Sequence, residues 1–204
     1  MSKTRFEAFS DGVFAFAITL LVLGFALPLA EDGKSLLSDG ALAHRLLAMW
    51  PGLLAYILSF AVIGLMWQNH HALFRLVVRI DRKTVALNLL LLMFAVFIPF
   101  ATQTLGAYET THSATFLYGV VLTCCSIAYT LLLEHLCRSK AFGGEVGPET
   151  LRQTRVGFRV GLAVYVGATL VSLVWPIVSF ALYVLITIYY FIPRGVDSDL
   201  AEAG

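Results

Sequence analysis

Long apolar stretches alternate with short polar connections along the whole chain. Uncharged, mainly apolar runs extend over 12–30, 46–74, 84–108, 110–133 and 160–193. Because a helix needs roughly 20 apolar residues to cross a bilayer, each of the first four runs predicts one membrane-spanning helix. The last run would form a helix about 51 Å long at 1.5 Å per residue. That length is too great for a hydrocarbon core of roughly 30 Å.

A break at Trp175-Pro176 explains the length of the last run. Proline ends helices because it lacks a backbone N–H and clashes with the preceding turn, and tryptophan favours the membrane interface. We therefore expect two helices there, the fifth extending back into the basic segment before Val160. The prediction is an all-α integral membrane protein, a single domain over 1–204 with six transmembrane helices at about 7–29, 43–75, 84–107, 111–136, 153–174 and 177–193.

The distribution of positive charge predicts the orientation of these helices. Six spans place both termini on the same side of the membrane. If that side is the cytoplasm, all of the 14 Lys and Arg residues except Lys34 and Arg45 lie inside. Cytoplasmic segments of membrane proteins carry the excess of Lys and Arg. The sequence therefore predicts an N-in, C-in topology.

The overall composition excludes several classes of protein. Hydrophobic residues make up 59% of the chain and charged residues 13%, whereas a soluble domain carries about 25% charged residues. An ordinary soluble enzyme, a disordered chain and a soluble coiled coil are therefore excluded. The net charge of +1 provides no basic field for nucleic acid. We expect a multi-pass protein in the lipid bilayer of a cell membrane, the inner membrane if the source is bacterial, with no nucleic-acid or soluble partner.

The chain offers no constellation typical of a metal site or of catalysis. His70 and His71 are adjacent and therefore face about 100° apart on a helix, and His112 is expected on the opposite side of the membrane. We therefore expect no bound metal and no cofactor. We also expect no enzymatic activity, since the sequence lacks a G-x-S-x-G nucleophile motif. The centres of the predicted spans hold no carboxylate, which argues against a proton-coupled carrier.

Two polar clusters flank the predicted spans at the cytoplasmic side. One consists of Arg5, Ser10 and Asp11 at the start of the first span, and the other is the segment 67–71 at the end of the second. Histidine and asparagine can hydrogen-bond a carboxylate, so the two clusters can form a network. The alternative is a helix cap with side chains that extend to the interface. The spacing alone leaves both readings open.

The first span carries an apolar stripe. Phe16, Leu20 and Leu23 fall at i, i+4 and i+7 and share one helix face, and Thr19 lies beside it. Such a stripe is typical of packing between membrane helices, but an apolar ring can also gate a pore by dewetting. The pattern does not distinguish these two roles.

The start of the chain also resembles a known family. Arg5, Phe9, Ser10, Asp11 and Gly12 fit the signature R-x-x-x-F-S-D-G. The chain is similar in this respect to the endosomal and lysosomal potassium channel family, in its bacterial single-repeat branch. Further resemblance lies in residues 13–23, 67–71, Asn88, 98–100 and Thr102.

This resemblance implies a potassium-permeable cation channel without a T-V-G-Y-G filter. Members of the family with one six-helix repeat are expected to be homotetramers. Potassium is the expected permeant ion, and the first helix of each subunit is expected to line a central pore. The resemblance places the constriction at Phe16 and the next layers at Thr19, Leu20 and Leu23. The family usually has Ile or Leu where this chain has Phe16. Four phenyl rings either tighten the constriction or turn away and leave Leu20 to close it.

The resemblance also implies contacts at the inner ends of the first two spans. Arg5, Ser10 and Asp11 are expected to bond with Trp67 and His70. The expected signature and inter-helix network consists of Arg5, Phe9, Ser10, Asp11, Gly12, Trp67, Asn69 and His70. Two other functions stay open from the sequence, a secondary transporter and a membrane subunit without transport activity.

Overall fold

The computed structural model describes residues 2–25, 39–108, 111–143 and 146–191. Within them the chain is built from helices, and several of these are apolar, which confirms the all-α prediction. The helices are α1 (Lys3–Val22), α2 (Asp39–Ala48), α3 (Trp50–Leu76), α4 (Arg82–Ala95), α5 (Ile98–Ala107), α6 (His112–Arg138), α7 (Pro148–Val171) and α8 (Pro176–Tyr190).

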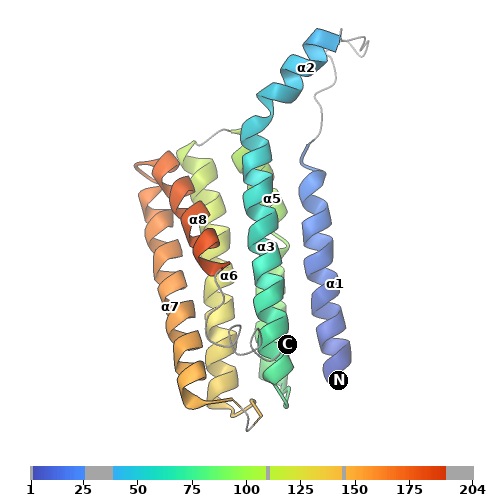
Figure 1. Cartoon of the computed structure of the whole chain (residues 1–204), viewed down its shortest axis with the longest axis vertical. Helices are drawn as coiled ribbons and strands as arrows, with labels where there is room; N and C mark the ends of the chain where they lie inside the picture. Colours follow the sequence, from blue (N-terminus) through green and yellow to red (C-terminus); the bar gives the residue numbers. More distant parts are fainter. Residues whose placement is uncertain (1, 26–38, 109–110, 144–145, 192–204) are drawn as a thin grey trace.

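The helices form a bundle in two groups (Figure 1). The N-terminal group contains α1, α3, α4 and α5, and the C-terminal group contains α6, α7 and α8. The two groups meet where α4 and α5 pack against α6 and where α3 packs against α8, and α4 packs more extensively on α6 than on α1. Short helix α2 projects from the end of the bundle opposite the N-terminus. This arrangement places α1 at the edge of the bundle, beside α3.

One face of α1 packs against the N-terminal group. The buried residues of α1 are spaced by three or four positions and are Phe6, Ser10, Phe14, Ala17 and Leu21. This periodicity matches the 3.6 residues of a helical turn, so the side chains share one face. Phe6 contributes to a hydrophobic core near the N-terminal end of α1, and Phe14, Ala17 and Leu21 contribute to a second core farther along the helix.

Prolines divide two of the expected helices. The expected helix over 43–75 is interrupted at Met49, where α2 ends and α3 begins with Pro51 in its first turn. The expected helix over 84–107 is interrupted between α4 and α5, and Pro99 lies in the first turn of α5. Both corrections have the same cause, because proline fits the first turn of a helix but interrupts a helix interior.

Four apolar segments of the described chain are long enough to cross a membrane. They are Trp50–Leu76, Arg82–Ala107, His112–Arg138 and Pro148–Val171. Helix α8 is apolar but shorter, with 15 residues, and it follows a break at Trp175. Helix α1 has 20 residues, with charged side chains confined to its first half. Residues 26–29 and 192–193 of the expected first and last spans lie outside the described residues.

Candidate functional site

A row of large apolar side chains on α1 points away from the rest of the chain. Phe9, Phe16 and Leu23 are 53%, 60% and 68% exposed and are separated by seven residues. Gly12 and Thr19 are exposed on the same face, three residues after Phe9 and Phe16. This alternation of three and four residues is the spacing by which helices pack along a common axis. We call these five residues the α1 seam.

Thr19 in the seam and Leu20 beside it differ in how far their side chains face outward. The Thr19 hydroxyl donates a hydrogen bond to the Phe16 carbonyl at 2.8 Å. Its oxygen lone pairs therefore stay available on the exposed side. Leu20 is only partly exposed, so of the four residues expected to line a pore it points least directly outward.

A buried chain of hydrogen bonds fixes the N-terminal half of α1. His70 Nε2 lies 2.9 Å from Asn88 Oδ1, and Asn88 Nδ2 donates to Ser10 Oγ at 2.9 Å. Ser10 Oγ in turn donates to the Phe6 carbonyl at 3.1 Å. Because an amide oxygen can only accept, the first bond requires a proton on His70 Nε2. The chain joins α3, α4 and α1 through side chains that are at most 1% exposed.

A second contact lies beside this chain. The indole nitrogen of Trp67 donates to Asp11 Oδ1 at 2.9 Å. Asp11 and Trp67 thus meet directly, whereas Ser10 reaches His70 only through Asn88. Arg5 is exposed and makes no hydrogen bond or ion pair with any residue of the described segments.

Asn88 is the bridging residue that the two polar clusters did not include. It occupies the apolar run over 84–108, and it is 1% exposed. A carboxamide in such a run has to find a hydrogen-bond partner, since an unpaired polar group in an apolar environment is costly. That isolated asparagine is the sequence signal for a partner on another helix.

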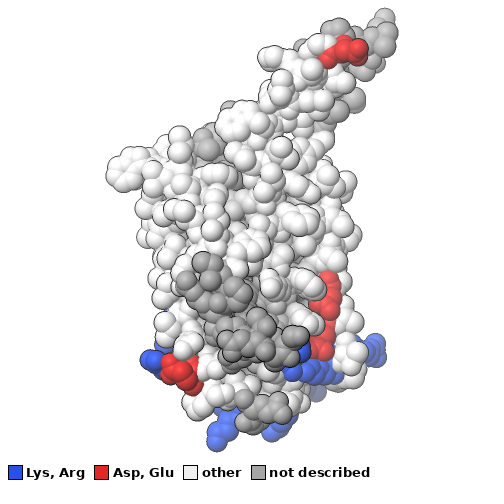
Figure 2. Space-filling model, viewed as in Figure 1, with Lys and Arg blue, Asp and Glu red and all other residues white. Residues whose placement is uncertain are grey.

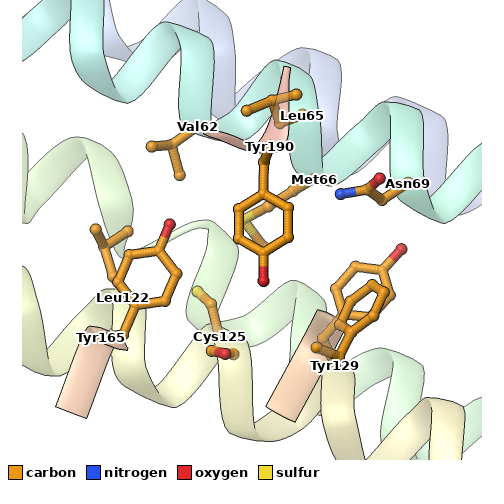
Figure 3. Close-up of a pocket in the computed structure, with 11 residues that line it drawn as sticks. Val62, Leu65, Met66, Asn69, Leu122, Cys125, Tyr129, Tyr165 and Tyr190 are labelled. Atoms are coloured by element: carbon orange, nitrogen blue, oxygen red, sulfur yellow. The ribbon is translucent and has the colours of Figure 1, made fainter. Parts of the chain in front are cut away.

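Asn69 lies outside this network. It lines a cavity of about 70 Å³ between α3 and the C-terminal group, together with Tyr129, Tyr165 and Tyr190 (Figure 3). The Tyr190 hydroxyl donates to the Gly157 carbonyl at 2.9 Å and so ties the end of α8 to α7. The neighbouring positions 69 and 70 therefore face different groups of helices.

A further set of neutral hydrogen bonds links three other helix positions. Thr102 Oγ1 lies 2.7 Å from Ser59 Oγ, which lies 3.0 Å from the Tyr118 hydroxyl. These three buried residues belong to α5, α3 and α6. Such bonds hold helices together where the hydrophobic effect cannot, because lipid is as apolar as the helix surface. Within the described residues, no three His, Cys, Asp or Glu side chains lie close enough to hold a metal ion.

Comparisons with known proteins agree on one family. The model of the family described as "Endosomal/lysosomal potassium channel TMEM175" matches residues 5–99. A potassium channel of Streptomyces collinus is 39% identical over 191 residues, which cover 91% of this chain and 90% of that protein. The human endosomal/lysosomal proton channel TMEM175 is 43% identical over 111 residues, which cover 53% of this chain and 22% of that protein.

A solved structure supports the same assignment. The crystal structure of a lysosomal potassium-selective channel TMEM175 homolog from Chamaesiphon minutus superposes with a TM-score of 0.81 at 33% sequence identity, covering 93% of this chain and 96% of that one. Bacterial relatives match over nearly their whole length, as expected for proteins with a single repeat. The chain therefore belongs to the TMEM175 family, a family of ion channels and not of enzymes, in its single-repeat bacterial branch.

Proposed function

We propose that the protein is a potassium-permeable channel in which α1 from each of four copies surrounds a central pore. The observation that carries this proposal is the α1 seam. One face of α1 is buried in its own protomer, while the opposite face presents regularly spaced side chains with no covering element among the described residues. Potassium as the permeant ion is supported by the names of the bacterial relatives, which are potassium channels.

The composition of the seam fits a pore better than a surface for lipid alone. Its large residues Phe9, Phe16 and Leu23 alternate with Gly12 and Thr19. Small residues allow helices to approach closely. Gly12 faces open space, since an added Cβ there would meet no atom within 4 Å. The Thr19 oxygen can take the place of a water molecule on a partly dehydrated cation.

We place the narrowest point at Phe16 and a second apolar layer at Leu23. Four phenyl rings around an axis would exclude water in the closed state, and opening would require α1 to rotate or move outward. Leu20 is the less favoured position for the constriction because its side chain is partly buried within the protomer.

The hydrogen-bonded inner end of α1 has a mechanical role in this proposal. The bond between Asp11 and Trp67 and the chain from Ser10 through Asn88 to His70 attach α1 to α3 and α4. An attached inner end limits how α1 can move. Widening of the pore would then occur by movement of α1 together with α3 and α4, or by tilting of its outer part.

We further propose six membrane spans with both termini in the cytoplasm of a bacterial cell. The six are α1, α3, the α4–α5 pair, α6, α7 and α8. Figure 2 shows charged side chains gathered at the end of the bundle that holds the N-terminus, and a white middle zone on the same face. Arg45 lies in α2 at the opposite end. This distribution supports the N-in, C-in orientation, because positive charge is enriched on the cytoplasmic side.

The decisive experiment is ion flux through purified protein in liposomes that hold a potassium gradient. Wild type is compared with Phe16→Ala and with Phe97→Ala, a control at a phenylalanine that is 52% exposed between α4 and α5. We expect potassium flux from wild type, a larger or less selective flux from Phe16→Ala, and no change from Phe97→Ala. Native mass spectrometry of the same samples is expected to give the mass of four chains.

Each other outcome contradicts a defined part of the proposal. Equal flux from wild type and Phe16→Ala would contradict a constriction at Phe16. Saturable flux without unitary current steps would indicate a secondary transporter. A folded oligomer that carries no potassium would contradict the channel and favour a membrane subunit without transport activity.

A further inference from the structure

Three arginines from two helices converge on one carboxylate at the charged end of the C-terminal group. Arg155 Nε and Nη2 donate to the two Glu134 oxygens at 2.9 and 2.5 Å. Arg138 Nη2 reaches the same carboxylate at 3.3 Å and Arg159 Nη2 at 3.5 Å. Glu134 and Arg138 lie in the last two turns of α6, and Arg155 and Arg159 lie in the first half of α7.

The cluster has more charge and more donors than its carboxylate can satisfy. One negative charge faces three positive charges, so two positive charges remain at a place where the Glu134 side chain is only 19% exposed. Each guanidinium has five N–H donors, while a carboxylate accepts at about four positions. Arg138 and Arg159 make only long contacts to Glu134 and are largely exposed. Their remaining donors are therefore available to an anion from outside.

An ordinary ion pair on the same helix shows the difference. Arg152 forms two hydrogen bonds with Glu149, at 2.9 and 2.8 Å. This pair is exposed, has one charge of each sign and is neutral as a unit. The cluster around Glu134 instead concentrates charge from two helices, which is the arrangement that recognises phosphate through planar guanidinium groups.

The surroundings of the cluster fit a lipid phosphate better than a free one. Val156 and Val160 follow Arg155 and Arg159 along α7 and are 50% and 46% exposed. Their apolar side chains lie next to the arginines, where the acyl chains of a bound lipid would begin. The orientation proposed above places this end at the headgroup level of the cytoplasmic leaflet, which carries anionic lipids.

We propose that Arg138, Arg155 and Arg159, which converge on Glu134, bind the phosphate of an anionic membrane phospholipid. This inference rests on the membrane orientation and not on ion conduction. A protein that binds the lipid but carries no potassium would contradict the proposed channel function and leave the lipid site standing.

The test is native mass spectrometry of the full-length protein. The protein is mixed in detergent with phosphatidylglycerol or with phosphatidylcholine of the same acyl chains, and the lipid that stays bound after release from detergent is measured. We expect wild type to retain phosphatidylglycerol in preference to phosphatidylcholine. Arg155→Gln and Arg159→Gln are each expected to lower that preference about fivefold, the contribution of one basic side chain at an anionic membrane surface. Arg152→Gln, the matched control, is expected to leave it unchanged.

A fourth variant separates binding from a purely structural role. Glu134→Gln keeps an acceptor oxygen and removes the negative charge, so we expect it to retain more phosphatidylglycerol than wild type. A structural ion cluster would instead make Glu134→Gln and Arg155→Gln lose lipid alike. Unchanged lipid retention in folded Arg155→Gln and Arg159→Gln would overturn the proposal. Displacement of the lipid by inorganic phosphate would overturn the assignment to a lipid.

Discussion

The two groups of helices differ in the hydrogen bonds that join their helices. In the N-terminal group, buried neutral hydrogen bonds join α1, α3 and α4 through Ser10, His70 and Asn88. In the C-terminal group, Ser179 and Tyr190 of α8 donate to backbone carbonyls of α7, and the charged contacts lie at one end, around Glu134. Deeper in that group, small residues of one helix let large residues of another approach, as Gly119 of α6 does for Tyr183 of α8.

This difference indicates which group has to hold a defined geometry. Hydrogen bonds are directional, so a buried network fixes the rotation of α1 about its own axis. The rotation of α1 decides which side chains form the seam. Close packing through glycine fixes distance, but it depends less on the identity of polar atoms. The family model covers 5–99, which is the part of the chain that contains the network and the seam.

The largest expected effect comes from crowding the C-terminal group. A Cβ added at Gly119 would lie 2.0 Å from the Tyr183 hydroxyl and 2.5 Å from Thr169 Oγ1. Tyr183 is fully buried, so it cannot move aside freely. We expect Gly119→Ala to lower the free energy of unfolding by about 3 kcal/mol, the upper part of the usual range for overpacking. Thermal unfolding in detergent measures it.

Two variants serve as controls for the crowding experiment. Gly167→Ala changes a glycine in α7 with no atom within 4 Å of the added Cβ, and it is expected to stabilise the helix slightly. Combining Gly119→Ala with Tyr183→Phe removes the closest atom and should restore part of the stability. An equal loss from the two glycine substitutions would contradict close packing at Gly119.

The next effect concerns the network in the N-terminal group. Asn88→Ala leaves the buried His70 N–H without its acceptor and removes the donor to Ser10. We expect a loss of about 2 kcal/mol, since an unpaired buried donor costs about 1–3 kcal/mol. Asn69→Ala is the matched control, because Asn69 is half-buried and lies on the cavity side of α3. It should change the melting temperature little.

Flux measurements extend this comparison to function. If the network fixes the rotation of α1, Asn88→Ala should also alter potassium flux in protein that is still folded, while Asn69→Ala should not. Equal effects of both substitutions on stability and flux would show that the adjoining ends of α3 and α4 matter as a whole and that the hydrogen-bonded chain has no special role.

Much of this fold is predictable when the length of each apolar run is combined with the positions of the prolines in it. The length of the last apolar run predicts a break at Trp175-Pro176, and α8 begins at Pro176. The same reasoning applied to Pro51 and Pro99 would have separated α2 from α3 and α4 from α5. Those runs are short enough to form one span each, so their length does not indicate a break.

The candidate site was predictable in its members and less so in its connections. Asp11 and Trp67 are in direct contact, which the topology and the signature allow one to expect. The role of Asn88 depends on which face of α4 meets α1, and hydrophobic periodicity gives little information when a helix is apolar on all sides. For the same reason the sequence could not show that Asn69 and His70 face different groups.

The smallest expected effect lies at Asp81, which contacts both groups. Its carboxylate caps α4 by accepting from the Thr84 backbone N–H at 2.7 Å, and it lies 3.0 Å from His135 Nε2 on α6. The Thr84 N–H, then His135 and the Thr84 hydroxyl, hold the pKa of Asp81 well below its usual value. A depressed pKa means that the ionised form is stabilised in the folded protein.

We therefore expect Asp81→Ala to cost about 1 kcal/mol at neutral pH, the usual contribution of a helix N-cap. The difference from wild type should shrink as the pH falls below about 4, because the carboxyl then protonates in the unfolded chain first and later in the folded protein. Thermal unfolding at neutral and acidic pH measures this. His135→Ala removes only the contact to α6 and should cost less than Asp81→Ala. If the two substitutions cost the same, Asp81 stabilises the protein by joining the two groups, and the boundary between them is held by charge as well as by packing.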